Sequence, residues 1–147
     1  MRKEKKKVAY EKTEVPVQKS QDSIRRLIMT RKGSKIAFVS EPPREGFAAV
    51  IELKGIPYQI RISAIARTRS GLTPRQSDAF REQEERRIWR VLYHHLKSIF
   101  EAADSGVMDF REMILPYIVT KSGKTIAEMI MPKLEEAIET NPARMLS

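Results

Sequence analysis

The stretch GFAAVIELKGIPYQIRI, residues 46–62, decides the fold because it contains two short apolar segments on either side of a tight turn. If residues 53–56 form the turn, the two segments pair as strands with their alternate apolar side chains on one face. The expected pairs on that face are Phe47 with Ile62, Ala49 with Ile60, and Ile51 with Tyr58. The sequence therefore predicts an antiparallel hairpin with one buried face.

An earlier strand, KIAFVS at residues 35–40, extends this hairpin to three strands. The segment EPPREG, residues 41–46, is expected to be the connecting loop. The resulting pairs are Ile36 with Ile51 and Phe38 with Ala49. The opposite face would be unusually apolar for a surface left in water, since it carries Ala37, Val39, Ala48 and Val50.

A short helix is expected before the sheet. Ser20 or Asp22 can cap a helix whose buried side carries apolar residues, and Gly33 can supply its left-handed exit. The apolar residues of this helix are Ile24, Leu27 and Ile28. The preceding segment TEVPV, residues 13–17, is predicted to be a short edge strand, because its proline cannot donate to a central ladder.

A long helix is expected after the sheet. Thr73, Pro74 and Gln76 form a capping-box start, and the helix is predicted to end near Asp104. Its apolar stripe consists of Ile88, Leu92, Leu96, Ile99 and Ala103, widened by Trp89, Val91, His95 and Phe100. Shorter helices are expected from Asp109 and from Thr125. The stripe of the last one is Ile126, Ile130, Leu134 and Ile138, divided at Pro132.

These elements predict an α+β fold: a three-stranded antiparallel meander preceded by a short helix and followed by a long helix and C-terminal helices that complete the core. Residues 1–12 are expected to be a flexible basic arm and residues 13–147 a single domain. Within that domain, residues 13–75 form a basic helix-plus-sheet half and residues 76–147 a mainly helical half.

The charge of the chain is uneven. The formal net charge is +9, yet residues 1–75 hold 18 Lys and Arg against 7 Asp and Glu, while residues 76–147 hold 10 against 12. A basic half on an ordinary fold favours an anionic partner over simple solubility. The chain has no cysteine, which excludes disulfide and thiolate chemistry. No apolar run is long enough for a secretory signal or a membrane span, so we expect a cytoplasmic protein with no membrane partner.

Nine cationic residues are candidates for contacts with nucleic-acid phosphates. They are Arg25, Arg26, Arg31, Lys32, Lys35, Arg61, Arg67, Arg69 and Arg90. Arg90 stands out because its helical neighbours three and four residues away include no carboxylate, so either a distant carboxylate or an external anion should balance it. The adjacent Trp89 fits core packing better than a stacking platform for a base.

A catalytic interpretation has weaker support. Glu52 and Lys54 form the Glu-x-Lys arrangement that some metal-dependent nucleases use, but a further carboxylate is needed, and only Glu41 or Glu45 is near. Lys54 also has an adequate role as a hairpin corner. His94 and His95 cannot chelate one ion together, because neighbouring helical side chains diverge by about 100°. We expect no catalytic residue, no metal and no cofactor.

The order helix, three strands, long helix over residues 20–104 is similar to that of double-stranded-RNA-binding domains and of phage single-strand annealing proteins. The segment QSDAFREQEE, residues 76–85, lacks the basic cluster that the first of these families carries there. Four further segments are VPVQKSQDSIRRLI, RRIWRVLYHHLKSIFEAADSGVMDF, ILPYIV and SGKTIAEMIMP. Together they resemble a group of small uncharacterised proteins encoded by tailed phages and prophages, which implies a setting and no particular activity.

The function expected from these observations is non-catalytic binding of nucleic acid, DNA or RNA, by a phage accessory protein for replication or recombination. The alternative is a protein–protein interaction module, such as a phage inhibitor or adaptor of a host protein, for which the apolar second face of the sheet is the support. A homo-oligomer is a further partner class, and a metal-dependent nuclease is a third function.

Overall fold

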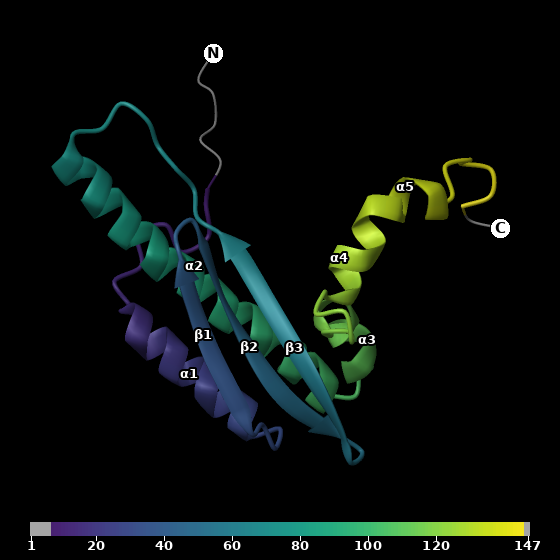
Figure 1. Cartoon of the computed structure of the whole chain (residues 1–147). Helices are drawn as coiled ribbons and strands as arrows, with labels where there is room; N and C mark the ends of the chain where they lie inside the picture. The colour runs from purple at the N-terminus through teal and green to yellow at the C-terminus, as the bar shows by residue number, and fades with distance from the viewer. Residues whose placement is uncertain (1–6, 146–147) are drawn as a thin grey trace.

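The computed structural model describes residues 7–145. Its elements are α1 (Val17–Met29), β1 (Lys35–Glu41), β2 (Arg44–Leu53), β3 (Ile56–Ile65), α2 (Pro74–Asp104), α3 (Phe110–Ile114), η1 (Leu115–Tyr117), α4 (Ile126–Ile130), η2 (Met131–Lys133) and α5 (Leu134–Ala137). The predicted α+β order is confirmed. Figure 1 shows α1 and α2 side by side on the same face of the sheet, with α3 and the later elements beyond the β3 edge.

The sheet has the order β1-β2-β3, and both strand pairs are antiparallel. The predicted register of β2 and β3 is confirmed, since Phe47 pairs with Ile62. The turn between them consists of Lys54 and Gly55, both with positive φ, as a two-residue hairpin requires.

The predicted register of β1 and β2 is wrong by two residues, because Ile36 pairs with Ala49 and not with Ile51. Pairing continues to Glu41 and Arg44, so the connection is a two-residue corner of Pro42 and Pro43, where a longer loop is expected from the sequence. A shift of two leaves each side chain on its predicted face.

The helix-facing side of the sheet and the two long helices form the core. Phe47, Ile51 and Ile60 are buried there against Ile24 of α1 and Leu96 of α2. Trp89 is 1% exposed, which confirms the core role predicted for it. Its Nε1 donates to the buried Glu45 carboxylate at 3.3 Å, and the Ser40 hydroxyl donates to the same carboxylate at 2.8 Å.

The other side of the sheet, the open sheet face, is the side turned away from α1 and α2. By strand alternation it carries Lys35, Ala37, Val39, Glu41, Arg44, Gly46, Ala48, Val50, Glu52, Pro57, Gln59, Arg61, Ser63 and Ile65. Ala37, Val39 and Ile65 are exposed, and Ala48 and Val50 are half-buried. The four apolar residues expected on the second face therefore lie there, among polar and charged residues.

The predicted start and exit of α1 are wrong. The helix begins at Val17 after Pro16, without a side-chain cap, and Ser20 is buried inside it, while residues 13–16 form no strand. At the exit, Lys32 adopts the left-handed conformation with φ 53°. Gly33 is needed for space instead, because a Cβ there would lie 2.2 Å from the Ile28 side chain.

The predicted capping box of α2 is confirmed, since Thr73 accepts from the Gln76 amide and Gln76 accepts from the Thr73 amide. The helix ends at Asp104, also as expected. Among residues 7–145, no helix combines the length and the apolar character needed to cross a membrane.

The C-terminal helices complete the core only in part. Phe110 and Ile114 of α3 are buried in it. The stripe predicted for the last helix does not face the core, because Ile130 and Ile138 are exposed. From residue 129 to residue 145 every residue except Leu134 is exposed, and Figure 1 shows this C-terminal projection running away from the sheet.

We predict that Gly46→Ala lowers the free energy of unfolding by roughly 1–3 kcal/mol, the usual cost of overpacking. A Cβ at Gly46 would lie 2.4 Å from the carbonyl oxygen of Ile62, and backbone cannot move aside as a flexible side chain can. Urea unfolding measures the change, with Ser63→Ala on the paired residue as the control. Equal stability of the two variants would contradict the prediction.

Candidate nucleic-acid interface

The nine candidate cations fall into separate groups in the structure. Arg31, Arg61 and Arg67 each form an ion pair with a carboxylate of another element. Arg25, Arg26 and Lys32 lie together on α1 and its exit turn. Lys35 begins β1 on the open sheet face, Arg69 is in the loop before α2, and Arg90 lies between α1 and α2. The structure therefore does not bring the nine into one surface.

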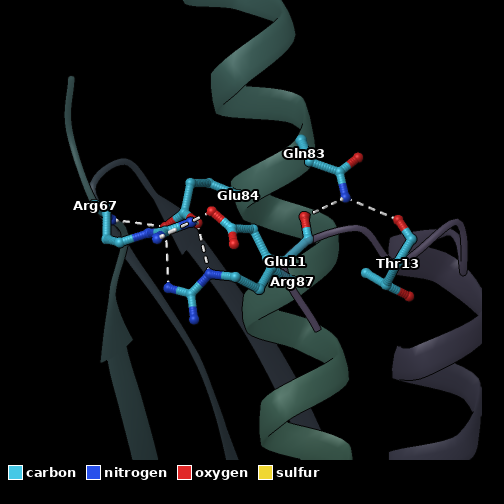
Figure 2. Close-up of polar contacts among 6 residues, drawn as sticks. All are labelled: Glu11, Thr13, Arg67, Gln83, Glu84 and Arg87. Atoms are coloured by element: carbon cyan, nitrogen blue, oxygen red, sulfur yellow. Dashed lines mark hydrogen bonds and ion pairs between the residues drawn. The ribbon is translucent and has the colours of Figure 1, made fainter. Parts of the chain in front are cut away.

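Arg67 follows β3 and contacts the buried Glu84 of α2 (Figure 2). Its Nε and terminal nitrogen donate to Glu84 Oε1 at 2.9 and 2.7 Å, and its backbone amide donates to Oε2 at 2.8 Å. Arg87 reaches the same carboxylate from the next turn of α2 at 2.5 Å. Glu11 lies 3.8 Å from Arg67 on its other side. This cluster fastens the exit of β3 to α2.

Burial alone would raise the pKa of the Glu84 carboxyl. Hydrogen bonds from Arg87 and Arg67 outweigh that effect and hold the pKa at about 2, below the ordinary 4.5. The hydrogen bond to Glu84 likewise raises the pKa of Arg67. The guanidinium of Arg67 is therefore paired with the Glu84 carboxylate inside the protein.

Arg31 and Arg61 are also fastened inside the protein. Arg31 forms an ion pair with Asp104 at the end of α2, and its guanidinium lies 4.6 Å from the centre of the Phe110 ring. Arg61 donates to Glu128 of α4 at 2.7 Å, and this hydrogen bond lowers the pKa of the Glu128 carboxyl. Both arginines hold C-terminal elements to the rest of the fold.

Of the two partners expected for Arg90, the internal carboxylate is not found within residues 7–145. The guanidinium of Arg90 donates to the Ser20 hydroxyl at 3.4 Å and lies 4.7 Å from the centre of the Tyr93 ring. Ser20 is buried in α1, so this contact bridges the two helices.

The α1 basic surface consists of Lys19, Arg25, Arg26 and Lys32, which are all exposed. No carboxylate of the described chain forms an ion pair with any of them. Arg25 lies over the Phe38 ring of β1, with its guanidinium carbon 5.2 Å from the ring centre. Asp22 is the only acidic residue of α1, and it accepts a hydrogen bond from Gln18.

Lys19 is a member of this surface that the sequence analysis missed. A helix that begins at Ser20 or Asp22, as the sequence predicts, does not include Lys19. With α1 beginning at Val17, Lys19 lies two turns before Arg26 and therefore on the same side of the helix. The seven-residue spacing of the two cations is the signal that could have revealed it.

Part of the expected N-terminal arm packs on α2. Gln83 Nε2 donates to the backbone carbonyls of Glu11 and Thr13 at 3.1 and 2.8 Å (Figure 2), and the Tyr10 ring stacks on His94 at 4.8 Å. Burial, together with Arg90 and Lys97, lowers the pKa of His94, which favours its neutral ring. Residues 1–6 of the expected arm lie outside the described residues.

The geometry does not assemble the nuclease arrangement. Glu45 faces the helices and is buried against Trp89, whereas Glu52 is exposed on the open sheet face. Lys54 lies in the turn after β2, whereas Glu41 pairs with Arg44 at the start of β2. Within residues 7–145 no three potential metal-binding side chains are grouped.

Comparison of the chain with family models, with curated proteins and with solved structures finds no match. The likeness to double-stranded-RNA-binding domains and to annealing proteins is one of element order alone. The function of this chain is therefore inferred from its own residues.

We predict that the stability of the wild type falls by about 3 kcal/mol as the pH drops from about 4.5 to about 2, through protonation of Glu84. Stability falls with falling pH because the pKa of Glu84 is lower in the folded state than in the unfolded state. The stabilisation from the ionised carboxylate is present above pH 4.5 and is lost as the pH approaches the folded-state pKa. Glu84→Gln should be less stable at neutral pH and should show a flatter dependence across this window in urea unfolding.

The control for this prediction is Glu82→Gln, an exposed position on the same helix. It should keep the pH dependence of the wild type. If Glu84→Gln shows the same dependence as the control, the acid sensitivity of the protein arises elsewhere.

Proposed function

We propose that this chain binds nucleic acid without catalysis, by placing the α1 basic surface against the phosphate backbone. The observation that carries the proposal is that these four cations are exposed and form no ion pair within residues 7–145, although other arginines of the same half are paired internally. Unpaired cations on one surface repel one another, and a polyanion relieves that repulsion.

The dimensions of α1 suit such a partner. Its 13 residues extend over about 20 Å, a length along which duplex DNA presents many phosphates. Arg90 lies beside α1 and forms no ion pair within residues 7–145, and Arg69 is exposed in the loop before α2, so both can add contacts. Contacts of this kind fix position on a backbone and do not read sequence.

The setting that fits this function is that of a phage accessory protein in replication or recombination, acting in the host cytoplasm. The resemblance of the four quoted segments to proteins of tailed phages and prophages supports it. DNA and RNA present the same phosphate groups, and the binding experiment below shows which of the two the protein prefers.

A second candidate function is interaction with another protein, including a host protein that the chain would inhibit or adapt. The open sheet face favours it, because Ala37, Val39 and Ile65 are exposed there and no helix or strand of residues 7–145 covers them.

We predict that labelled single-stranded and duplex DNA and RNA bind the protein with affinities that fall linearly with salt concentration on a logarithmic scale. The triple variant Arg25→Gln, Arg26→Gln, Lys32→Gln should weaken binding by on the order of tenfold or more and reduce the salt slope by roughly 2–3. Fluorescence anisotropy across a salt series measures both quantities.

The matched control removes the same charge elsewhere, as Lys121→Gln, Lys124→Gln, Lys133→Gln, three exposed positions in the C-terminal part. It should keep most of the wild-type affinity and slope. Equal losses in both triple variants would mean that net charge alone drives binding. The absence of binding to all four nucleic acids at about 50 mM salt would overturn the proposal, since such contacts are strongest there.

A further inference from the structure

Two apolar surfaces of the described chain lack a packing partner within it. The C-terminal projection exposes Met129, Ile130, Met131, Ile138 and Met145. The open sheet face exposes Val39 and Ile65 beside small apolar residues. Apolar patches of this kind on a protein surface mark sites of association.

We propose that the C-terminal projection of one copy of the chain packs on the open sheet face of a second copy, and that the exchange is reciprocal. This inference is independent of nucleic-acid binding, because neither surface includes a residue of the α1 basic surface. It assigns one occupant, a second copy, to the open sheet face.

The receiving surface suits the side chains of the projection. A hollow of about 650 Å³ lies on the open sheet face, where Ala37, Ala48 and Val50 contribute small apolar side chains. Short side chains leave room for long ones, and Met129 and Met131 are flexible enough to fill an irregular hollow. Helices that lay an apolar side into a groove are a common mode of recognition.

Both surfaces carry mixed charges, but the charge at the hollow is opposite to that in the middle of the projection, where Lys133 and Arg144 flank three acidic residues. Lys35 is the charged residue among the described residues that line the hollow, and Arg44 lies farther along the same face. Glu135, Glu136 and Glu139 are exposed on the projection, and within residues 7–145 none of these glutamates, nor Lys35 or Arg44, forms an ion pair. Glu41 and Glu52 also lie on the open sheet face but do not line this hollow. Opposite charges at the rim would orient the projection.

The root of the projection explains why the occupant is a second copy. Glu128, the residue before the projection, is held by Arg61 on β3, and Thr125 is bridged to Val119. From this root the chain leads away from its own sheet (Figure 1), so the projection is presented outward. A twofold arrangement lets each copy donate its projection and receive that of its partner, which gives two equal interfaces.

The first test is the mass of the protein in solution. Analytical ultracentrifugation over a concentration series should give twice the chain mass of 17.0 kDa. Met131→Glu on the projection and Ala37→Glu on the open sheet face should each shift the protein toward the monomer, with at least about a tenfold rise in the dimer dissociation constant. Both positions are exposed, and circular dichroism verifies that the variants fold. Val107→Glu, at an exposed position outside both surfaces, should dimerise as the wild type does.

A mixing experiment decides the arrangement. A dimer of one Met131→Glu copy with one Ala37→Glu copy retains one intact projection on one intact sheet face. Mixing the two monomeric variants should therefore restore dimers, at about the weaker affinity of a single interface. Likewise, Lys35→Glu should weaken association, and a copy carrying Glu135→Lys and Glu136→Lys should restore it.

Three results would overturn the proposal. If the wild type stays monomeric up to about 100 μM, a second copy does not bind the open sheet face, and its occupant is a segment of the same chain or another protein. A dimer that survives Ala37→Glu would use projections alone or a different surface. Variants that remain monomeric after mixing would exclude the exchange of projections. None of these measurements involves nucleic acid. A negative result would therefore overturn the proposed dimer and leave the proposed nucleic-acid binding unaffected.

Discussion

Two helices packed on one face of a three-stranded sheet set the constraint on which the other features of this protein depend. The apolar residues on the helix-facing side of β1, β2 and β3 pack under α1 and α2, together with the buried Trp89 and Leu96 of α2. Within residues 7–145, neither α1 nor α2 covers the other face of the sheet, which meets α4 only through contacts such as Arg61 with Glu128. The same packing places α1 at the outside of the helix layer, where its polar side meets solvent (Figure 1).

Burial also determines which arginines are available for a partner. Glu84 is 1% exposed, and a carboxylate removed from water needs charged or hydrogen-bonding partners. Arg67 and Arg87 meet that need. Arg31 and Arg61 pair instead with the exposed carboxylates of Asp104 and Glu128, at the end of α2 and in α4. A positive net charge therefore overstates the charge offered to solvent, and the cations of α1 are among those that form no ion pair within residues 7–145.

The sequence was sufficient where local chemistry decides the structure. The Lys54–Gly55 turn fixed the β2–β3 register, and the Thr73 capping box fixed the start of α2. It was insufficient where tertiary contacts decide: the corner at Pro42 and Pro43 shortened a predicted loop, and the contact of Ser20 with Arg90 lies inside a helix predicted to begin there. The internal carboxylates of the three paired arginines lie 17 to 73 residues away in the chain, beyond any local pattern.

The contact of Gln83 with the N-terminal segment has a consequence for sequence variation. Gln83 donates to the backbone carbonyls of Glu11 and Thr13 and touches neither side chain through these bonds. Substitutions at the two positions leave both bonds possible, because every residue supplies a carbonyl. An inserted or deleted residue between them would move one carbonyl out of reach of the amide. The contact thus constrains the length of this segment more strictly than its composition.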